Sequence, residues 1–126
     1  MKFMVFVRAN TYSEAGEPPP PKLMAVIGKL AEEGFKNGTL VSTGGLLPSS
    51  QGARLRLSNA KINVTDGPFA EAKELVGGWA IIQAKSREEA VEQVKAFMKV
   101  HTDVMGPSWE MECELRGMAE PPRGTS

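Results

Sequence analysis

Hydrophobic and polar positions alternate in several short stretches of the chain, which predicts strands. Residues 2–8 carry apolar side chains on both faces, so we expect a strand that is covered on both sides. Residues 54–58 and 61–65 alternate around a turn at Asn59-Ala60, which predicts a hairpin with its apolar residues on one face. The apolar run at residues 77–84 favours a central strand.

Two longer stretches show helical spacing. The first predicts a helix over residues 22–37 that stops at Asn37-Gly38 and follows a polar, proline-rich loop over residues 10–21. The second begins at a capping box, in which the Ser86 hydroxyl satisfies a helix N–H and Glu89 reaches back to the cap. Both helices have one apolar face to bury.

The order of these elements predicts the fold. A short strand is expected over residues 39–46, and the alternation from Trp109 to Arg116 predicts a last strand. We therefore expect an α+β fold, a ferredoxin-like βαββαβ sandwich with an inserted β-hairpin, an antiparallel sheet and two helices on one face. The other face of the sheet keeps apolar residues from residues 2–8 and around Trp79, so we expect a homodimer joined through the sheet faces.

Composition narrows the class of protein. The 126 residues predict one domain over residues 1–117 with a tail over 118–126, and the 15 basic and 15 acidic residues cancel, so no direct nucleic-acid partner is expected. The single cysteine, Cys113, excludes an intramolecular disulfide and is expected to be inert in the core. No apolar run approaches the roughly 20 residues of a membrane span, so we expect a cytoplasmic protein without membrane contact.

Residues 65–79 hold the most distinctive pattern. Asp66-Gly67-Pro68-Phe69 precedes the alternating charges of residues 71–74 and then Gly77-Gly78. This pattern resembles the signature of the DGPF-domain proteins, a branch of the YCII-related group, and the resemblance runs from Met1 to about Leu115. It implies a dimeric α/β-barrel architecture and a link to extracytoplasmic-function sigma factors.

The resemblance also points to what this chain lacks. Typical YCII-like proteins carry a histidine early in their first helix, which together with an aspartate suggests a His-Asp site. This chain has Lys22-Leu23-Met24-Ala25 in that region. The pair is therefore not carried over.

Asp66 is the first candidate for chemistry. Its structural interpretation is a turn residue that accepts backbone N–H bonds. Its functional interpretation is a carboxylate that faces a cleft between sheet and helices, as a general base or a ligand contact. Glu71 and Lys73 are either solvated surface charges or a rim over that cleft, with Lys73 attracting an anion and Glu71 moving a proton.

Three further residues complete the candidate site. His101, the single histidine, extends the apolar stripe of the second helix and is either a packed helix-terminal residue or an acid or base. Arg8 is a candidate anion-binding group, and Thr43 is expected across the sheet from Asp66. Gly44-Gly45 and Gly77-Gly78 lack the spacing of a phosphate loop, and we expect neither a metal nor a cofactor.

These residues support two hypotheses of function. The first is binding of a small organic molecule in a cleft near Asp66, with cofactor-independent lyase or isomerase chemistry. The alternative is a non-catalytic regulatory or partner-binding module, and a purely structural dimer is a third hypothesis.

Overall fold

The computed structural model describes residues 1–69 and 75–120. Along the chain these residues form β1 (Lys2–Arg8), α1 (Thr11–Glu14), α2 (Pro21–Asn37), β2 (Leu40–Gly45), the 3-10 helix η1 (Ser49–Gln51), β3 (Ala53–Ser58), β4 (Lys61–Asp66), β5 (Val76–Gln83), α3 (Arg87–Met105) and β6 (Cys113–Gly117).

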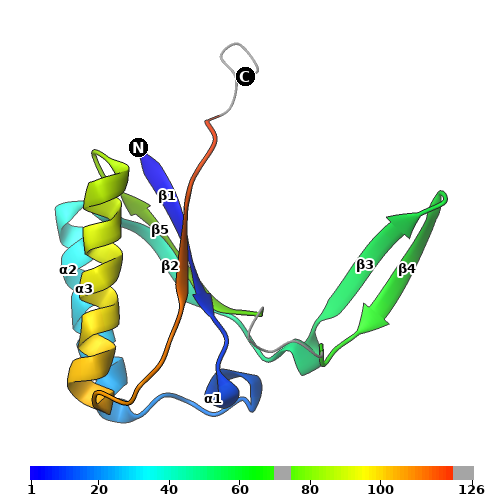
Figure 1. The fold of residues 1–126 in the computed structure, drawn as a ribbon, viewed down its shortest axis with the longest axis horizontal. Coiled ribbons are helices and arrows are strands. Elements are labelled where there is room, and N and C mark those ends of the chain that lie inside the picture. Colours follow the sequence, from blue (N-terminus) through cyan, green and yellow to red (C-terminus); the bar gives the residue numbers. More distant parts are fainter. Residues whose placement is uncertain (70–74, 121–126) are drawn as a thin grey trace.

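Four strands form one antiparallel sheet in the order β2-β5-β1-β6. Helices α2 and α3 lie side by side on one face of this sheet (Figure 1). The ferredoxin-like α+β class predicted from the pattern is confirmed, and β5 is the central strand expected from its apolar run. The sheet of one chain is open and does not close into a barrel.

The core lies between the sheet and α3. Phe3 and Val5 of β1 point to this side and pack with Ile82 of β5 and with Ala90, which is fully buried in α3. Leu23 is the buried residue of α2. The helical residue of this buried cluster therefore comes from α3.

The opposite face of the sheet is also apolar. Since neighbours along a strand alternate, Met4 and Phe6 of β1 point away from the helices, and so do their β5 partners Ile81 and Trp79. All four side chains are partly exposed. Within the described residues no second layer covers them.

Strands β3 and β4 form a separate two-stranded sheet. This hairpin lies on the side opposite the helices and extends away from the body (Figure 1). Its turn residues Asn59 and Ala60 both have left-handed backbone angles, with φ of 52° and 62°, as the tight hairpin turn requires. The hairpin predicted from the alternation is confirmed.

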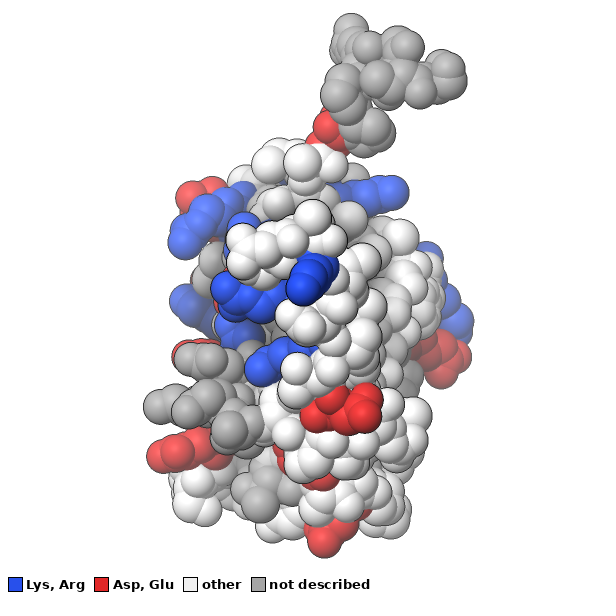
Figure 2. All heavy atoms as spheres, turned by 90° about the vertical axis from the view of Figure 1, so that its right-hand side faces the viewer, with Lys and Arg blue, Asp and Glu red and all other residues white. Residues whose placement is uncertain are grey.

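The apolar face of the hairpin is open to solvent. Its four large side chains are between 61% and 71% exposed, and they belong to Leu55, Leu57, Ile62 and Val64. Figure 2 looks at the molecule from this side and shows lysine and arginine side chains mainly over the upper half and acidic ones mainly toward the lower end.

The Asp66-Gly67-Pro68-Phe69 motif forms the root of the hairpin. The Gly67 N–H donates to the Gly52 carbonyl at 3.0 Å, and the Phe69 N–H donates to the Ser49 hydroxyl at 3.2 Å. A Cβ atom at Gly67 would lie 1.7 Å from the Ser49 carbonyl oxygen, so only glycine fits there. The Arg54 guanidinium lies 4.1 Å from the centre of the Phe69 ring. The motif therefore fastens the hairpin to η1.

Glu14 ties this root to the short helix α1. Its carboxylate accepts hydrogen bonds from the Ser49 N–H at 2.9 Å and from the Ser49 hydroxyl at 2.5 Å. The hydroxyl contact first, and the N–H contact second, lower the pKa of Glu14 below its ordinary value.

Two segments differ from the sequence-based prediction. Residues 11–14 form a helical turn inside the expected loop, because the Asn10 side chain accepts from the Ser13 N–H and the Ser13 hydroxyl accepts from the Asn10 N–H, each at 2.8 Å. The last strand begins at Cys113 and not at Trp109, so that part of the prediction was wrong. Its partner β1 ends at Arg8, and the bond from the Arg8 N–H to the Glu112 carbonyl is the last one between them.

Of the two hydrogen bonds predicted for the cap of α3, the one to the Ser86 hydroxyl is confirmed. The Ser86 hydroxyl accepts from the Glu89 N–H at 3.1 Å. The Glu89 carboxylate accepts from the Lys85 N–H at 3.3 Å, one residue before the expected cap. No helix in the described residues is long and apolar enough to cross a membrane.

Candidate functional site

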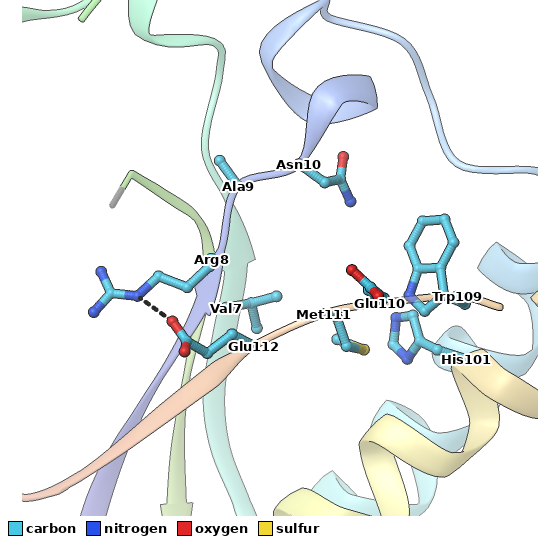
Figure 3. A pocket seen from close by; sticks show the side chains of 9 residues that line it. All are labelled: Val7, Arg8, Ala9, Asn10, His101, Trp109, Glu110, Met111 and Glu112. Atoms are coloured by element: carbon cyan, nitrogen blue, oxygen red, sulfur yellow. Dashed lines mark ion pairs between the residues drawn. The ribbon is translucent and has the colours of Figure 1, made fainter. Parts of the chain in front are cut away.

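A pocket of about 560 Å³ opens where β1 ends, beside the C-terminal part of α3 and the segment that leads into β6 (Figure 3). Its lining consists of Val7, Arg8, Ala9, Asn10, His101, Trp109, Glu110, Met111 and Glu112. We call this the polar pocket. It brings together Arg8 and His101, two of the residues singled out from the sequence.

His101 is buried, with 6% of its surface exposed, at the inner side of the polar pocket. Its Nδ1 lies 2.9 Å from the Phe97 carbonyl oxygen, and the Phe97 ring meets the imidazole edge-on at 4.8 Å. Because a carbonyl only accepts, Nδ1 carries the hydrogen of this bond. In the neutral ring the lone pair is then on Nε2, which is the atom that remains for a ligand.

Trp109 stands between two other rings. Its centroid lies 6.2 Å from that of Tyr12 on α1 and 6.5 Å from that of His101, with interplanar angles of 20° and 19°. The Trp109 Nε1 atom is buried and has no hydrogen-bond partner among the described residues. A buried donor without a partner costs about 1–3 kcal/mol, so this N–H is one that an acceptor would satisfy.

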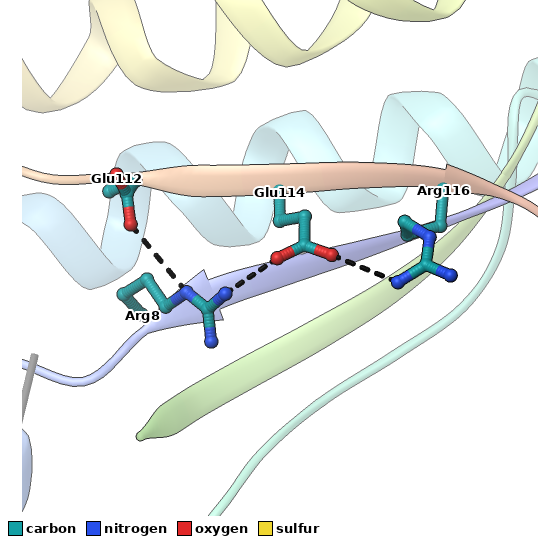
Figure 4. Close-up of polar contacts among 4 residues, drawn as sticks. All are labelled: Arg8, Glu112, Glu114 and Arg116. Carbon is teal, nitrogen blue, oxygen red and sulfur yellow. Dashed lines mark hydrogen bonds and ion pairs between the residues drawn. The ribbon is translucent and has the colours of Figure 1, made fainter. Parts of the chain in front are cut away.

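Arg8 lies at the other side of the polar pocket, and its guanidinium points away from Trp109 and His101 (Figure 3). It contacts the Glu114 carboxylate at 2.5 Å and the Glu112 carboxylate at 3.6 Å, while Arg116 binds Glu114 at 3.2 Å (Figure 4). Two carboxylates therefore already balance the charge of Arg8. The anion-binding role expected of Arg8 stays a prediction.

A second pocket of about 620 Å³ lies between the sheet and the two long helices, and we call it the apolar chamber. Its wall includes Ile27 and Leu30 of α2, Leu40 of β2, and Val94 and Phe97 of α3. Val7, Arg8 and Asn10 line both pockets, so the chamber adjoins the polar pocket at the end of β1.

The model of the YCII-related domain matches residues 1–105. The chain belongs to the YCII-related family. A search of the curated proteins finds no match. The matched span of this YCII-related chain includes Arg8, Asn10 and His101 but ends before Trp109. The polar pocket is thus completed by residues beyond the span shared with the family model.

Asp66 lies elsewhere. It is the exposed last residue of β4, pairs with Ala53 of β3, and lines neither pocket. Thr43 pairs with Ala80 in the main sheet, so the expectation that Thr43 and Asp66 lie across one sheet was wrong, because the hairpin forms a sheet of its own. Within residues 1–69 and 75–120, no group donates a hydrogen bond to the Asp66 carboxylate. Its proposed chemistry stays a prediction.

The remaining predicted residues fall in different places. Thr43 lines the apolar chamber with Arg8, and its hydroxyl donates to the Trp79 carbonyl at 2.9 Å. Glu71 and Lys73 lie outside the described residues. Over residues 1–69 and 75–120, no group of three or more His, Cys, Asp or Glu side chains is placed to hold a metal ion.

Sequence reasoning missed Trp109 and Asn10 as site residues. The alternation around Trp109 indicated an inward-facing strand residue. This explains why its ring is buried, but it does not predict that its N–H lacks a hydrogen-bond partner. A buried indole N–H needs a hydrogen-bond acceptor. A tryptophan predicted to face inward could therefore have been recognised as a candidate site residue. Asn10 was assigned to a loop, and the capping exchange with Ser13 that fixes it depends on the helical turn.

Proposed function

We propose that this YCII-related protein binds a small, neutral organic molecule, with a carbonyl-type acceptor in the polar pocket and an apolar body in the adjoining chamber. The observation that carries the proposal is the buried, unpartnered Nε1 of Trp109 in the wall of the polar pocket. A ligand oxygen there would complete the hydrogen bond that the protein leaves open.

The charges of the polar pocket favour a neutral ligand. Glu110 and Glu112 both belong to its lining, and the cation of the same lining, Arg8, is held by Glu112 and Glu114. An anionic ligand would meet two carboxylates with little positive charge to offset them. A neutral carbonyl accepts a hydrogen bond without that repulsion.

The dimensions and composition of the two pockets agree with this ligand. Volumes of about 560 and 620 Å³ fall in the range of roughly 300–1,000 Å³ that small-molecule sites occupy. The apolar chamber offers aliphatic and aromatic side chains, and Arg8 and Asn10 supply polar groups where it adjoins the polar pocket. Such an arrangement orients a ligand by its polar end.

We extend the proposal to lyase or isomerase chemistry without a cofactor. The Trp109 N–H would polarise the carbonyl, and His101 Nε2 would remove a proton from the neighbouring carbon, which as general base catalysis contributes typically 10²–10⁴-fold in rate. Exchange of those protons for deuterium in D₂O, followed by NMR, would be faster with the wild type than with His101→Gln. Equal exchange rates would rule out this role of His101.

The alternative is a non-catalytic regulatory or partner-binding module in the cytoplasm, including one linked to extracytoplasmic-function sigma factors. The absence of a histidine from the first turn of α2 favours it, because the His-Asp pair of its relatives is not available. Ligand binding without turnover is the result expected of such a module. In either case we propose a homodimer joined through the outer sheet faces.

The test is a thermal-shift screen of neutral ketones and lactones, beginning with acetophenone, with benzoate as the anion of matched shape. We expect neutral ligands to raise the melting temperature by mass action and benzoate to raise it less. Trp109→Phe keeps an aromatic ring but removes the N–H and part of the indole, so it should weaken binding by at least about twofold to tenfold, the range that one hydrogen bond of roughly 0.5–1.5 kcal/mol gives. The smaller ring lowers the melting temperature of the free protein, so the shift caused by the ligand is measured against each variant's own ligand-free value.

Asp66→Asn is the matched control at the position favoured by the sequence. It should leave ligand binding unchanged. Loss of binding in Asp66→Asn with full binding in Trp109→Phe would place the site at the hairpin root and contradict the proposal.

A further inference from the structure

The hairpin β3-β4 exposes more apolar surface than an isolated pair of strands can support. Its four large apolar side chains are each more than 60% exposed, and they form one face through the pairs Leu55↔Val64 and Leu57↔Ile62. A single two-stranded hairpin is marginally stable in water, and apolar patches of this kind mark interfaces. Another surface must therefore cover it.

We propose that the apolar face of the hairpin packs on the outer sheet face of a second copy of this chain. The inference rests on the homodimer proposed above and says what lies on each outer sheet face in it, since the hairpin of each copy covers the sheet of the other. The surface it covers carries Met4, Phe6, Trp79 and Ile81.

The position of the hairpin supports this occupant. The hairpin lies on the side of the sheet opposite the helices, which is the side of the uncovered face (Figure 1). The hairpin and the uncovered sheet face therefore lie on the same side of the molecule (Figure 1). A two-fold axis between two copies lets each hairpin meet the other sheet at once, as an isologous interface requires.

The size of the combined surface fits a stable dimer. Specific interfaces use about 20–30 residues a side. One face of the hairpin together with the outward-facing residues of the four-stranded sheet reaches the lower end of this range, whereas either surface alone falls short of it. Use of both surfaces is thus what makes the interface large enough.

The first test is the double variant Leu57→Lys/Ile62→Lys in the full chain. Analytical ultracentrifugation at micromolar concentration should give a dimer dissociation constant at least tenfold higher than that of the wild type. Asn63→Lys adds a charge to the opposite face of the same hairpin and should leave the dimer intact. Far-ultraviolet circular dichroism should be unchanged in both, since α2 and α3 do not contact the substituted residues.

The second test is disulfide formation between two different chains. A Leu57→Cys chain mixed with a Met4→Cys chain should form a mixed dimer on oxidation. The native Cys113 interferes little, because burial and then Glu112 raise its pKa to about 11.

Two results would overturn the inference. If the wild type and the double variant dimerise equally, the hairpin is not in the interface, although the sheet-to-sheet dimer stands. If Leu57→Cys chains cross-link with one another and not with Met4→Cys, the hairpins pair together. Neither result affects ligand binding at Trp109.

Discussion

At the scale of single residues, the glycine of the Asp66-Gly67-Pro68-Phe69 motif has a physical explanation. Gly67 passes so close to the Ser49 carbonyl that a Cβ atom would lie 1.7 Å from its oxygen. The motif identified the family from the sequence, but its contacts are those of an anchor for the hairpin. The aspartate of the same motif is exposed.

Gly67→Ala should therefore detach the hairpin root from η1 and lower stability. We expect a loss of several kcal/mol, toward the upper end of single substitutions, because backbone and not a flexible side chain must move. Urea denaturation measures the loss. Gly45→Ala is the matched control, since nothing lies within 4 Å of a Cβ atom placed there. Equal stability of the two variants would show that the close approach is not required.

Cys113 gives a prediction on pH. Burial, and to a smaller extent Glu112, raise its pKa from 9.0 to about 11. Because the folded state holds the proton more tightly, this residue favours folding fully below pH 9, and its contribution is lost as pH rises from 9 through about 11. At pH 8 the native thiol should react with a disulfide reagent roughly a hundredfold more slowly than in the unfolded chain. Similar rates in buffer and in urea would contradict the burial.

At the scale of elements, the sequence predicted what depends on local periodicity. Strand β1, the hairpin and the two long helices follow from their own alternation or spacing. Strand β6 was predicted too long because its length depends on where its partner ends, at Arg8, and not on its own pattern. Helix α1 was missed because it is four residues long and depends on the exchange between Asn10 and Ser13.

The cap of α3 supplies a prediction at this scale. Ser86→Ala removes the acceptor of the Glu89 N–H and should cost about 1 kcal/mol, measured by urea denaturation. Ser86→Asp keeps an acceptor in place and should cost less. If Ser86→Ala proves as stable as the wild type, the cap is not what starts the helix.

At the scale of the whole molecule, the candidate site depends on contacts between distant segments. The polar pocket joins the end of β1, the end of α3 and the lead-in to β6, so residues near position 10 meet residues near 101 and 109. Only the topology brings them together, and this explains why the sequence favoured Asp66. The position of the hairpin also depends on tertiary structure. Its sequence pattern predicts which face is apolar, but it does not predict which surface covers that face.

The indole N–H signals of the two tryptophans, Trp79 and Trp109, test the central claim most directly. In ¹H–¹⁵N NMR spectra, with the Trp109 signal assigned by its loss in Trp109→Phe, addition of acetophenone should shift that signal downfield as Nε1 gains an acceptor. Any shift of the Trp79 signal should be smaller, because Trp79 lines the apolar chamber, where the ligand offers no acceptor. A ligand that raises the melting temperature but leaves the Trp109 signal unmoved would contradict the account.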